Sequence, residues 1–124
     1  MSACKPSMYI TIERHRYDYA VKATVYELQI GIQKNEDEVL VHKLITRYSV
    51  LDQFDKQLRI MIGDDINLPA FPPKRYLWNN DPSFVQEREK GLKLFLEGIT
   101  KIPGILQIPY VQDFFAISEL NSEK

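Results

Sequence analysis

The spacing of hydrophobic and polar positions changes near residue 47, and this change divides the chain into a strand-rich part and a helical part. From Ala23 to Gln33 the two kinds of side chain alternate with a period of two, which predicts a half-buried strand with Tyr26, Leu28, Ile30 and Ile32 on its inner face. A shorter run at Tyr9–Ile12, and a third at Val39–Thr46 after the polar turn 34–37, indicate two more strands. Three consecutive strands with short connections predict an antiparallel meander.

Helical spacing begins after Tyr48, where apolar residues recur three or four positions apart at Leu51, Phe54, Leu58 and Met61. Ser49 and Asp52 resemble a capping box at the start of this helix, and Gly63 followed by two aspartates is expected to end it.

A second helix is expected to begin near residue 82 and to end before Pro103. Either Asp81 caps it with Pro82 at the first helical position, or Ser83 caps it with Gln86 closing a box. Its apolar stripe consists of Val85, Leu92, Phe95, Leu96 and Ile99. A short third helix near Tyr110–Ile117 is predicted to bury Val111, Phe114 and Phe115.

The segment 68–80 contains several prolines, which exclude a helix and a central strand. One interpretation is a protein ligand, because Pro69-x-x-Pro72-x-Lys74 fits the common pattern bound by Src-homology 3 domains. The other is a stiff loop that presents Lys74 and Arg75 beside an apolar tip of Tyr76, Leu77 and Trp78, a combination suited to a membrane interface. Trp78 could instead fold back into the core.

The composition is that of one globular domain: 124 residues, 44% hydrophobic and 27% charged. A formal net charge of -1 argues against a generally basic nucleic-acid-binding protein. Cys4 is the single cysteine, so no internal disulfide is possible. We find no apolar run typical of a signal peptide or a membrane span and expect a soluble intracellular domain at 9–117, between tails at 1–8 and 118–124.

No arrangement of residues predicts an enzyme. His15 and His42 are the only histidines, and neither lies in a nucleophile or metal-ligand signature. The acidic runs at 36–38 and 64–65 are typical of solvated turns. We therefore expect no catalytic activity, no metal and no cofactor.

Arg88 and the Arg47-Tyr48-Ser49 junction are the candidate binding residues. At about 100° per residue, Arg88 falls in the same arc as the apolar stripe of the second helix. It could pair with a buried carboxylate or snorkel, or it could line a cavity and hold a phosphate or vicinal hydroxyls. At the junction, the backbone N–H groups that open the first helix attract anions, Arg47 adds a charged fork and Tyr48 a flat ring. The alternative is a core tyrosine beside a surface arginine.

In this order and spacing the features resemble the phox-homology (PX) domain, a phosphoinositide-binding module of sorting nexins and related endosomal proteins. The resemblance rests on the three strands, on Arg-Tyr-Ser opening a helix, on Leu-Pro-x-x-Pro-Pro-Lys at 68–74 and on Glu-Arg-x-x-Gly-Leu-x-x-Phe-Leu at 87–96. It covers about Tyr9 to Ile117 and implies an α+β fold. In that fold a three-stranded antiparallel meander packs against a helical subdomain with a proline-rich loop.

The resemblance also implies a role for each site residue. Arg47 would bind the 3-phosphate of phosphatidylinositol 3-phosphate, with Ser49 in the same motif, and Tyr48 would stack under the inositol ring. Lys74 would reach the 1-phosphate, and Arg88 would hold the 4- and 5-hydroxyls. Tyr76, Leu77 and Trp78 are the expected membrane-inserting residues.

We accordingly expect a monomeric module that binds phosphatidylinositol 3-phosphate on endosomal or vacuolar membranes and serves protein sorting, with no nucleic-acid partner. The alternative is a protein-interaction module of the same fold, with weak lipid affinity, that uses the proline-rich loop or a helix face. Thr46 and Leu51 depart from the family pattern, which usually has a second basic residue and a phenylalanine there. The missing base predicts weaker affinity or a broader choice of head group.

Overall fold

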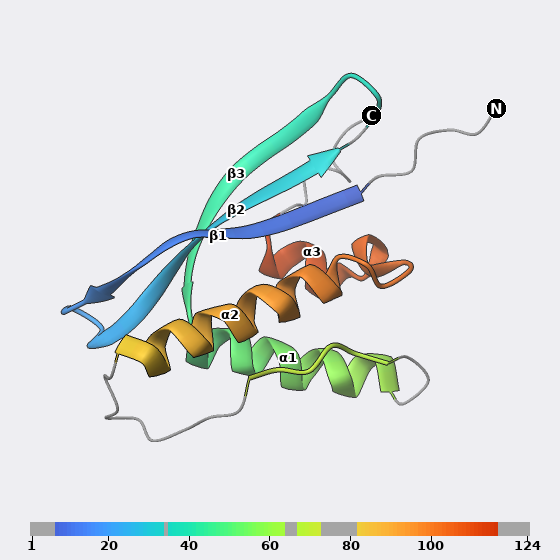
Figure 1. Cartoon of the computed structure of the whole chain (residues 1–124). Coiled ribbons are helices and arrows are strands. Elements are labelled where there is room, and N and C mark those ends of the chain that lie inside the picture. Colours follow the sequence, from blue (N-terminus) through green and yellow to red (C-terminus); the bar gives the residue numbers. More distant parts are fainter. Residues whose placement is uncertain (1–6, 34, 64–66, 73–81, 117–124) are drawn as a thin grey trace.

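Three strands are followed by helices, and the structure, a computed structural model, describes residues 7–33, 35–63, 67–72 and 82–116. The strands are β1 (Ser7–Asp18), β2 (Ala23–Gln33) and β3 (Val39–Arg47). Figure 1 shows the helices on one side of the sheet, which confirms the α+β class. They are α1 (Tyr48–Ile62), α2 (Pro82–Ile99), the short 3-10 helix η2 (Ile105–Gln107) and α3 (Pro109–Phe114). In these ranges no helix combines the length and the hydropathy needed to cross a membrane.

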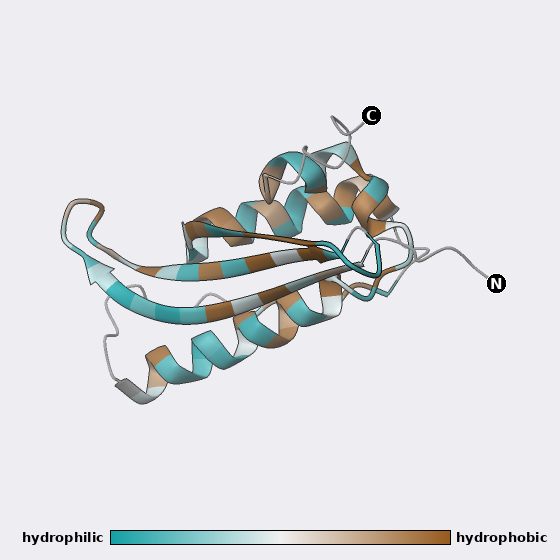
Figure 2. Cartoon of the chain, turned by 90° about the horizontal axis from the view of Figure 1, so that it is seen from above, coloured by the Kyte–Doolittle hydropathy of each residue, from teal (hydrophilic) through white to brown (hydrophobic). Residues whose placement is uncertain are grey.

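The sheet is the predicted antiparallel meander, with strand order β1-β2-β3. The alternation is visible along the strands in Figure 2, and the four inner side chains of β2 are at most 1% exposed. β2 has the predicted bounds, whereas β1 begins at Ser7 and continues to Asp18. The apolar pattern did not predict the additional residues of β1, because polar side-chain pairs stabilise them. Arg14 and Arg16 both donate hydrogen bonds to Glu27.

The predicted capping box at the start of α1 is wrong. The N-cap residue is Arg47, which makes no side-chain cap bond, and Ser49 lies inside the helix and is exposed. The helix begins two residues earlier than a Ser49 cap allows, and this start places Tyr48 in the core at 8% exposure. Met61 is also not a core residue, because it is 46% exposed at the end of the helix. Gly63, with φ of 81°, ends α1 as predicted.

The other helices follow the predicted stripes with shifted ends. α2 begins at Pro82, as the first alternative expects, and Asp81 lies outside the described residues. Its stripe packs into the core with Leu92, Phe95, Leu96 and Ile99 fully buried. α3 ends at Phe114, earlier than predicted, and is preceded by η2, which the pattern did not indicate. Val111 and Phe115 are fully buried, whereas Phe114 is only partly so.

Candidate functional site

The guanidinium of Arg88 on α2 lies over the ring of Tyr48 on α1. The Cζ atom of Arg88 lies 4.1 Å from the centre of the Tyr48 ring and 4.9 Å from the centre of the Phe84 ring. The guanidinium therefore lies close to two aromatic rings. The negative face of an aromatic ring attracts a cation, so these contacts are favourable. The predicted placement of Arg88 on the packed side of its helix is confirmed.

Two nitrogen atoms of this guanidinium are buried without a hydrogen-bond partner. They are Nε and Nη2, and the hydroxyl of Thr46 is the other such side-chain group within the described ranges. Thr46 lies opposite Tyr26 in the sheet. Burial raises the pKa of the Tyr26 hydroxyl, and the charge of Arg88 opposes that rise. A buried donor without a partner costs about 1–3 kcal/mol, so such donors are rare in folded proteins and are typical of functional sites.

Tyr48 connects the start of α1 to the proline-rich segment. Its hydroxyl donates a hydrogen bond of 2.6 Å to the carbonyl oxygen of Pro72, and its ring centre is 5.2 Å from that of Phe71. Burial raises the pKa of this hydroxyl, the charge of Asp52 adds to the rise, and the charge of Arg88 opposes it. Tyr48 is thus a neutral donor held in place, with Arg88 over its ring.

Two glycines of α2 let the proline-rich segment lie directly on the helix. A Cβ atom on Gly91 would come within 2.9 Å of the Pro72 Cβ, and one on Gly98 within 2.7 Å of the Pro69 Cβ. From the other side, Arg59 of α1 donates from Nη2 to the carbonyl oxygen of Pro69 at 2.7 Å. The described part of the segment, residues 67–72, is therefore held at Pro69 and at Pro72 between α1 and α2. The sequence contains a signal for this packing. Two glycines lie seven residues apart in the helix, and two prolines lie three residues apart in the extended segment that packs on it.

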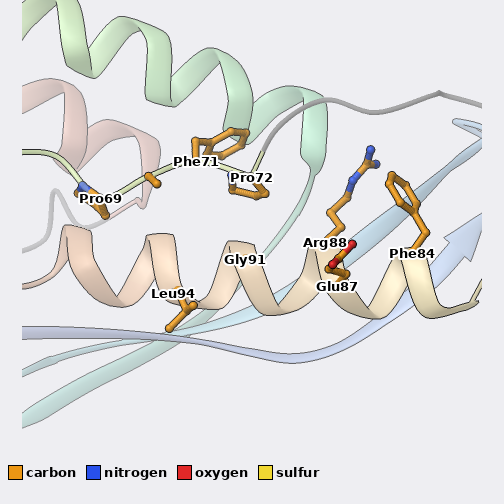
Figure 3. A pocket seen from close by; sticks show the side chains of 9 residues that line it. Pro69, Phe71, Pro72, Phe84, Glu87, Arg88, Gly91 and Leu94 are labelled. Atoms are coloured by element: carbon orange, nitrogen blue, oxygen red, sulfur yellow. The ribbon is translucent and has the colours of Figure 1, made fainter.

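A cavity of about 400 Å³ lies between this segment and α2. Figure 3 shows Pro72 facing Gly91, with Arg88 and Phe84 side by side toward the start of the helix. The cavity has a guanidinium at one end and an otherwise largely apolar wall. It is lined by Pro69, Ala70, Phe71, Pro72, Phe84, Glu87, Arg88, Gly91 and Leu94. Its size and its few polar groups are typical of a ligand pocket.

Arg47 precedes Tyr48 at the start of α1, in extended conformation. The helix has no acidic residue in its first turn and no side-chain cap, which leaves its first N–H groups able to bind an anion. In the sheet register Arg47 lies beside Val25, on the face opposite to that of Thr46. The side chain of Arg47 makes no hydrogen bond or ion pair with another described residue, so the structure brings Tyr48 and Arg88 together but shows no side-chain bond from Arg47 to them.

The remaining predicted residues divide into two groups. Lys74, Tyr76, Leu77 and Trp78 lie outside the described residues. Both histidines have structural partners: His15 Nδ1 contacts the Glu89 carboxylate of α2, and His42 Nε2 is 2.7 Å from the carbonyl oxygen of Phe115. Over the ranges that the structure describes, no three His, Cys, Asp or Glu side chains are grouped to hold a metal ion. The arrangement provides donors and an aromatic ring for a ligand that carries oxygen atoms.

Comparisons with known proteins point to one family. The sequence model of the PX domain matches residues 34–118. Human sorting nexin-31 is 34% identical over 76 residues, and mouse sorting nexin-21 is 28% identical over 74 residues. These matches cover 61% and 60% of this chain. They span only 17% and 20% of the two relatives, about a fifth of their length or less.

Solved structures show the same fold. A designed CISK-PX domain superposes with a TM-score of 0.67 at 20% identity, covering 85% of this chain and 95% of that one. The PX domain of mouse SNX19, solved with a bound sulphate ion, gives a TM-score of 0.60 at 22% identity and covers 89% and 94%. At these identities the likeness establishes the architecture.

Proposed function

Because the chain belongs to the PX domain family, whose members are in general non-enzymatic phosphoinositide-binding modules, we propose that it binds phosphatidylinositol 3-phosphate. It would thereby attach its parent protein to endosomal or vacuolar membranes during protein sorting. The observation that carries the proposal is the half-buried Arg88 side chain, whose Nε and Nη2 atoms are buried without a partner and whose guanidinium lies over the Tyr48 ring. A cation with unpaired donors at a pocket suits a ligand rich in oxygen atoms.

In the proposed complex each part of the site takes one part of the head group. Arg88 donates from Nε and Nη2 to the vicinal hydroxyls of the inositol ring. Since Arg88 covers the Tyr48 ring at 4.1 Å, an inositol ring that stacks on the same face must move the guanidinium aside. Arg47 and the free N–H groups at the start of α1 bind the 3-phosphate, and Lys74 binds the 1-phosphate.

The end of the molecule that carries Arg88 also presents exposed aromatic side chains. At the turn between β1 and β2, Tyr19 is 82% exposed and its ring lies 4.8 Å from that of Tyr17. Figure 1 shows this turn at the same end as the start of α2. Tyrosine favours the membrane–water interface, so this placement supports a lipid surface on that side, together with the apolar loop tip at Tyr76–Trp78.

The packing of the prolines does not favour the alternative in which this segment binds a protein partner. The rings of Pro69 and Pro72 lie on Gly98 and Gly91. A Src-homology 3 domain reads the exposed ridge of a proline helix, so binding would require the segment to leave α2. The lipid function needs no such rearrangement.

Co-sedimentation with vesicles tests the proposal. Phosphatidylcholine vesicles would carry phosphatidylinositol or one of its 3-, 4- or 4,5-phosphorylated forms. We expect binding to the 3-phosphate vesicles above all others. Arg47→Gln should abolish binding while the circular dichroism spectrum stays unchanged, whereas Lys56→Gln, an exposed cation on α1, should bind as the wild type does. Equal binding to every anionic vesicle, or wild-type binding by folded Arg47→Gln, would overturn the proposal.

A further inference from the structure

The two edge strands of the sheet, β1 and β3, differ in how they are protected. An exposed strand edge pairs with other strands unless a bulge, charges or a covering element prevents it. β1 has two of these devices. Its register is irregular between Ile12 and Arg14, and His15 contacts Glu89 of the covering helix α2, whereas the charges of Arg14 and Arg16 are both paired with Glu27 of β2.

β3 has no bulge, since it contains no proline and pairs with β2 without a register shift. His42 contacts the carbonyl oxygen of Phe115 at 2.7 Å, but it does so from the inner face of the sheet. In the part of the chain that the structure describes, no segment other than β2 hydrogen-bonds to its backbone. Val39, Val41 and Ile45 are 49%, 49% and 56% exposed. Exposed apolar side chains along an unpaired strand edge are the combination that invites another strand.

Lys43 does not guard this edge. Its Nζ atom lies 3.1 Å from a carboxylate oxygen of Glu13, which belongs to β1 on the far side of β2. The side chain is therefore held across the sheet surface toward β1. A lysine protects an edge when its charge stands beside the unpaired backbone, and here the charge is directed away from it.

We propose that β3 pairs antiparallel with β3 of a second copy of this chain, which joins the two sheets into one. The charge pattern of the strand selects this occupant. Acidic residues precede the strand at 36–38, basic residues lie toward its end at Lys43 and Arg47, and no acidic residue lies within 39–47. An antiparallel copy places the acidic end of each strand beside the basic end of the other, and a twofold pairing of this kind closes on itself.

A twofold axis at His42 gives the most complementary register. It sets Val39 opposite Ile45 of the second copy, and Val41 opposite the aliphatic part of Lys43. It also brings the acidic end near Asp37 toward Arg47 of the second copy. This pairing covers all three exposed apolar side chains and sets no like charges directly opposite each other. The proposal differs from the sequence-based expectation of a monomer, and the exposure of the three apolar side chains along this edge is what the structure adds.

Sedimentation equilibrium of the 124-residue protein, from about 1 µM to about 1 mM, tests the proposal, because small interfaces associate weakly. We expect a reversible monomer–dimer equilibrium. Val41→Lys should weaken dimerisation at least about tenfold, since it sets two lysines face to face. Val21→Lys is the matched control: Val21 is similarly exposed, at 44%, but lies in the β1–β2 turn. A monomer at every concentration, or equal effects of the two substitutions, would overturn the proposal.

Charge exchange and hydrogen exchange test the same edge independently. Asp37→Arg should weaken the dimer, and adding Arg47→Asp should restore it. Failure of the double variant to recover would refute the antiparallel register.

Hydrogen exchange tests the edge in the wild type and so needs no variant to fold. Amide exchange in β3 should slow as protein concentration rises, while exchange in the β1–β2 turn does not change. Exchange in β3 that is independent of concentration would refute the pairing. Neither experiment involves lipid, so the dimer and the lipid function can fail separately.

Discussion

The guanidinium of Arg88 covers the Tyr48 ring at 4.1 Å, and two of its nitrogen atoms are buried without a partner. Arg59 of α1 shows the contrasting case. Its Nε lies 2.8 Å from the Asp55 carboxylate and its Nη2 is 2.7 Å from the carbonyl oxygen of Pro69. Arg59 satisfies groups of the fold, whereas Arg88 has donors left over. The first arrangement is structural, and the second is what a ligand-binding arginine needs.

Replacing each of these arginines by methionine, which keeps the packing volume, should separate the two roles. Arg88→Met should leave the melting temperature unchanged or slightly higher, because it removes buried donors that have no partner. It should weaken binding to phosphatidylinositol 3-phosphate vesicles more than about tenfold, since a charge-assisted bond is worth about 1.5–3 kcal/mol. Thermal unfolding and vesicle co-sedimentation measure the two effects.

Arg59→Met should do the reverse. It leaves Asp55, which is 6% exposed, without its cation, and should lower the free energy of unfolding by about 1–3 kcal/mol. Lipid affinity at a temperature where the variant is folded should change little. If instead Arg88→Met lowers the melting temperature strongly and leaves binding intact, Arg88 is a structural residue.

Gly91→Ala and Gly98→Ala should destabilise the protein, although alanine is the better helix former by about 1 kcal/mol. The added Cβ would come within 2.9 Å and 2.7 Å of proline side-chain carbons. Such overpacking costs about 1–3 kcal/mol and would push the segment off α2. Urea unfolding measures the effect, and Lys90→Ala, at an exposed position of the same helix, should be neutral or slightly stabilising. A stability gain in both glycine variants would show that the proline-rich segment does not need this close approach.

Leu77→Ala combined with Trp78→Ala tests the membrane-inserting role assigned to the loop tip. Burying a large apolar side chain contributes about 1.5–3 kcal/mol, so losing two should weaken vesicle binding more than about tenfold. Affinity for a short-chain, water-soluble analogue should stay within about threefold of the wild type, because that ligand fills only the pocket. Trp78 fluorescence should also shift to the blue when vesicles are added to the wild type. Equal losses for both ligands would mean that these residues shape the pocket instead.

Two carboxylates should give opposite pH dependences of stability. A hydrogen bond from Arg14 lowers the pKa of Glu27 below its ordinary 4.5, whereas burial raises that of Asp55 above its ordinary 3.8 despite the opposing charge of Arg59. The contribution of ionised Glu27 is complete above pH 4.5 and is lost as the pH falls through the lower folded-state pKa. The advantage of the wild type over Glu27→Gln in melting temperature should therefore shrink as the solution is acidified.

Asp55 follows the opposite sign. Its protonated form is favoured in the folded state, so the stability of the wild type relative to Asp55→Asn should fall as the pH rises from 3.8 through the raised folded-state pKa. Melting temperatures of the three proteins between about pH 3 and pH 7 measure both trends. Parallel curves for all three would contradict both assignments.

The sequence by itself determined the elements whose signal lies in consecutive residues. The period-two run of Ala23–Gln33 became β2 with those bounds, and the stripe that ends at Ile99 became the buried face of α2. Arg88 was placed on the packed side of its helix for the same reason, since helical geometry fixes direction within a few turns. The PX family could likewise be identified from motif order.

Only the tertiary structure decided which of these surfaces meet. Tyr48 and Arg88 are far apart in the chain, and their contact depends on how α1 and α2 pack, which no local period encodes. α1 begins at Tyr48, whose ring is buried, and not after Ser49 as the sequence pattern predicted. Ser49 therefore lies inside the helix and does not cap it. The role of Gly91 and Gly98 also depends on tertiary packing, because a Cβ atom at either position would collide with a proline of the segment that lies on α2. The predicted meander already makes β3 an edge strand, but the exposure of Val39, Val41 and Ile45 along it was decided by where the helices pack.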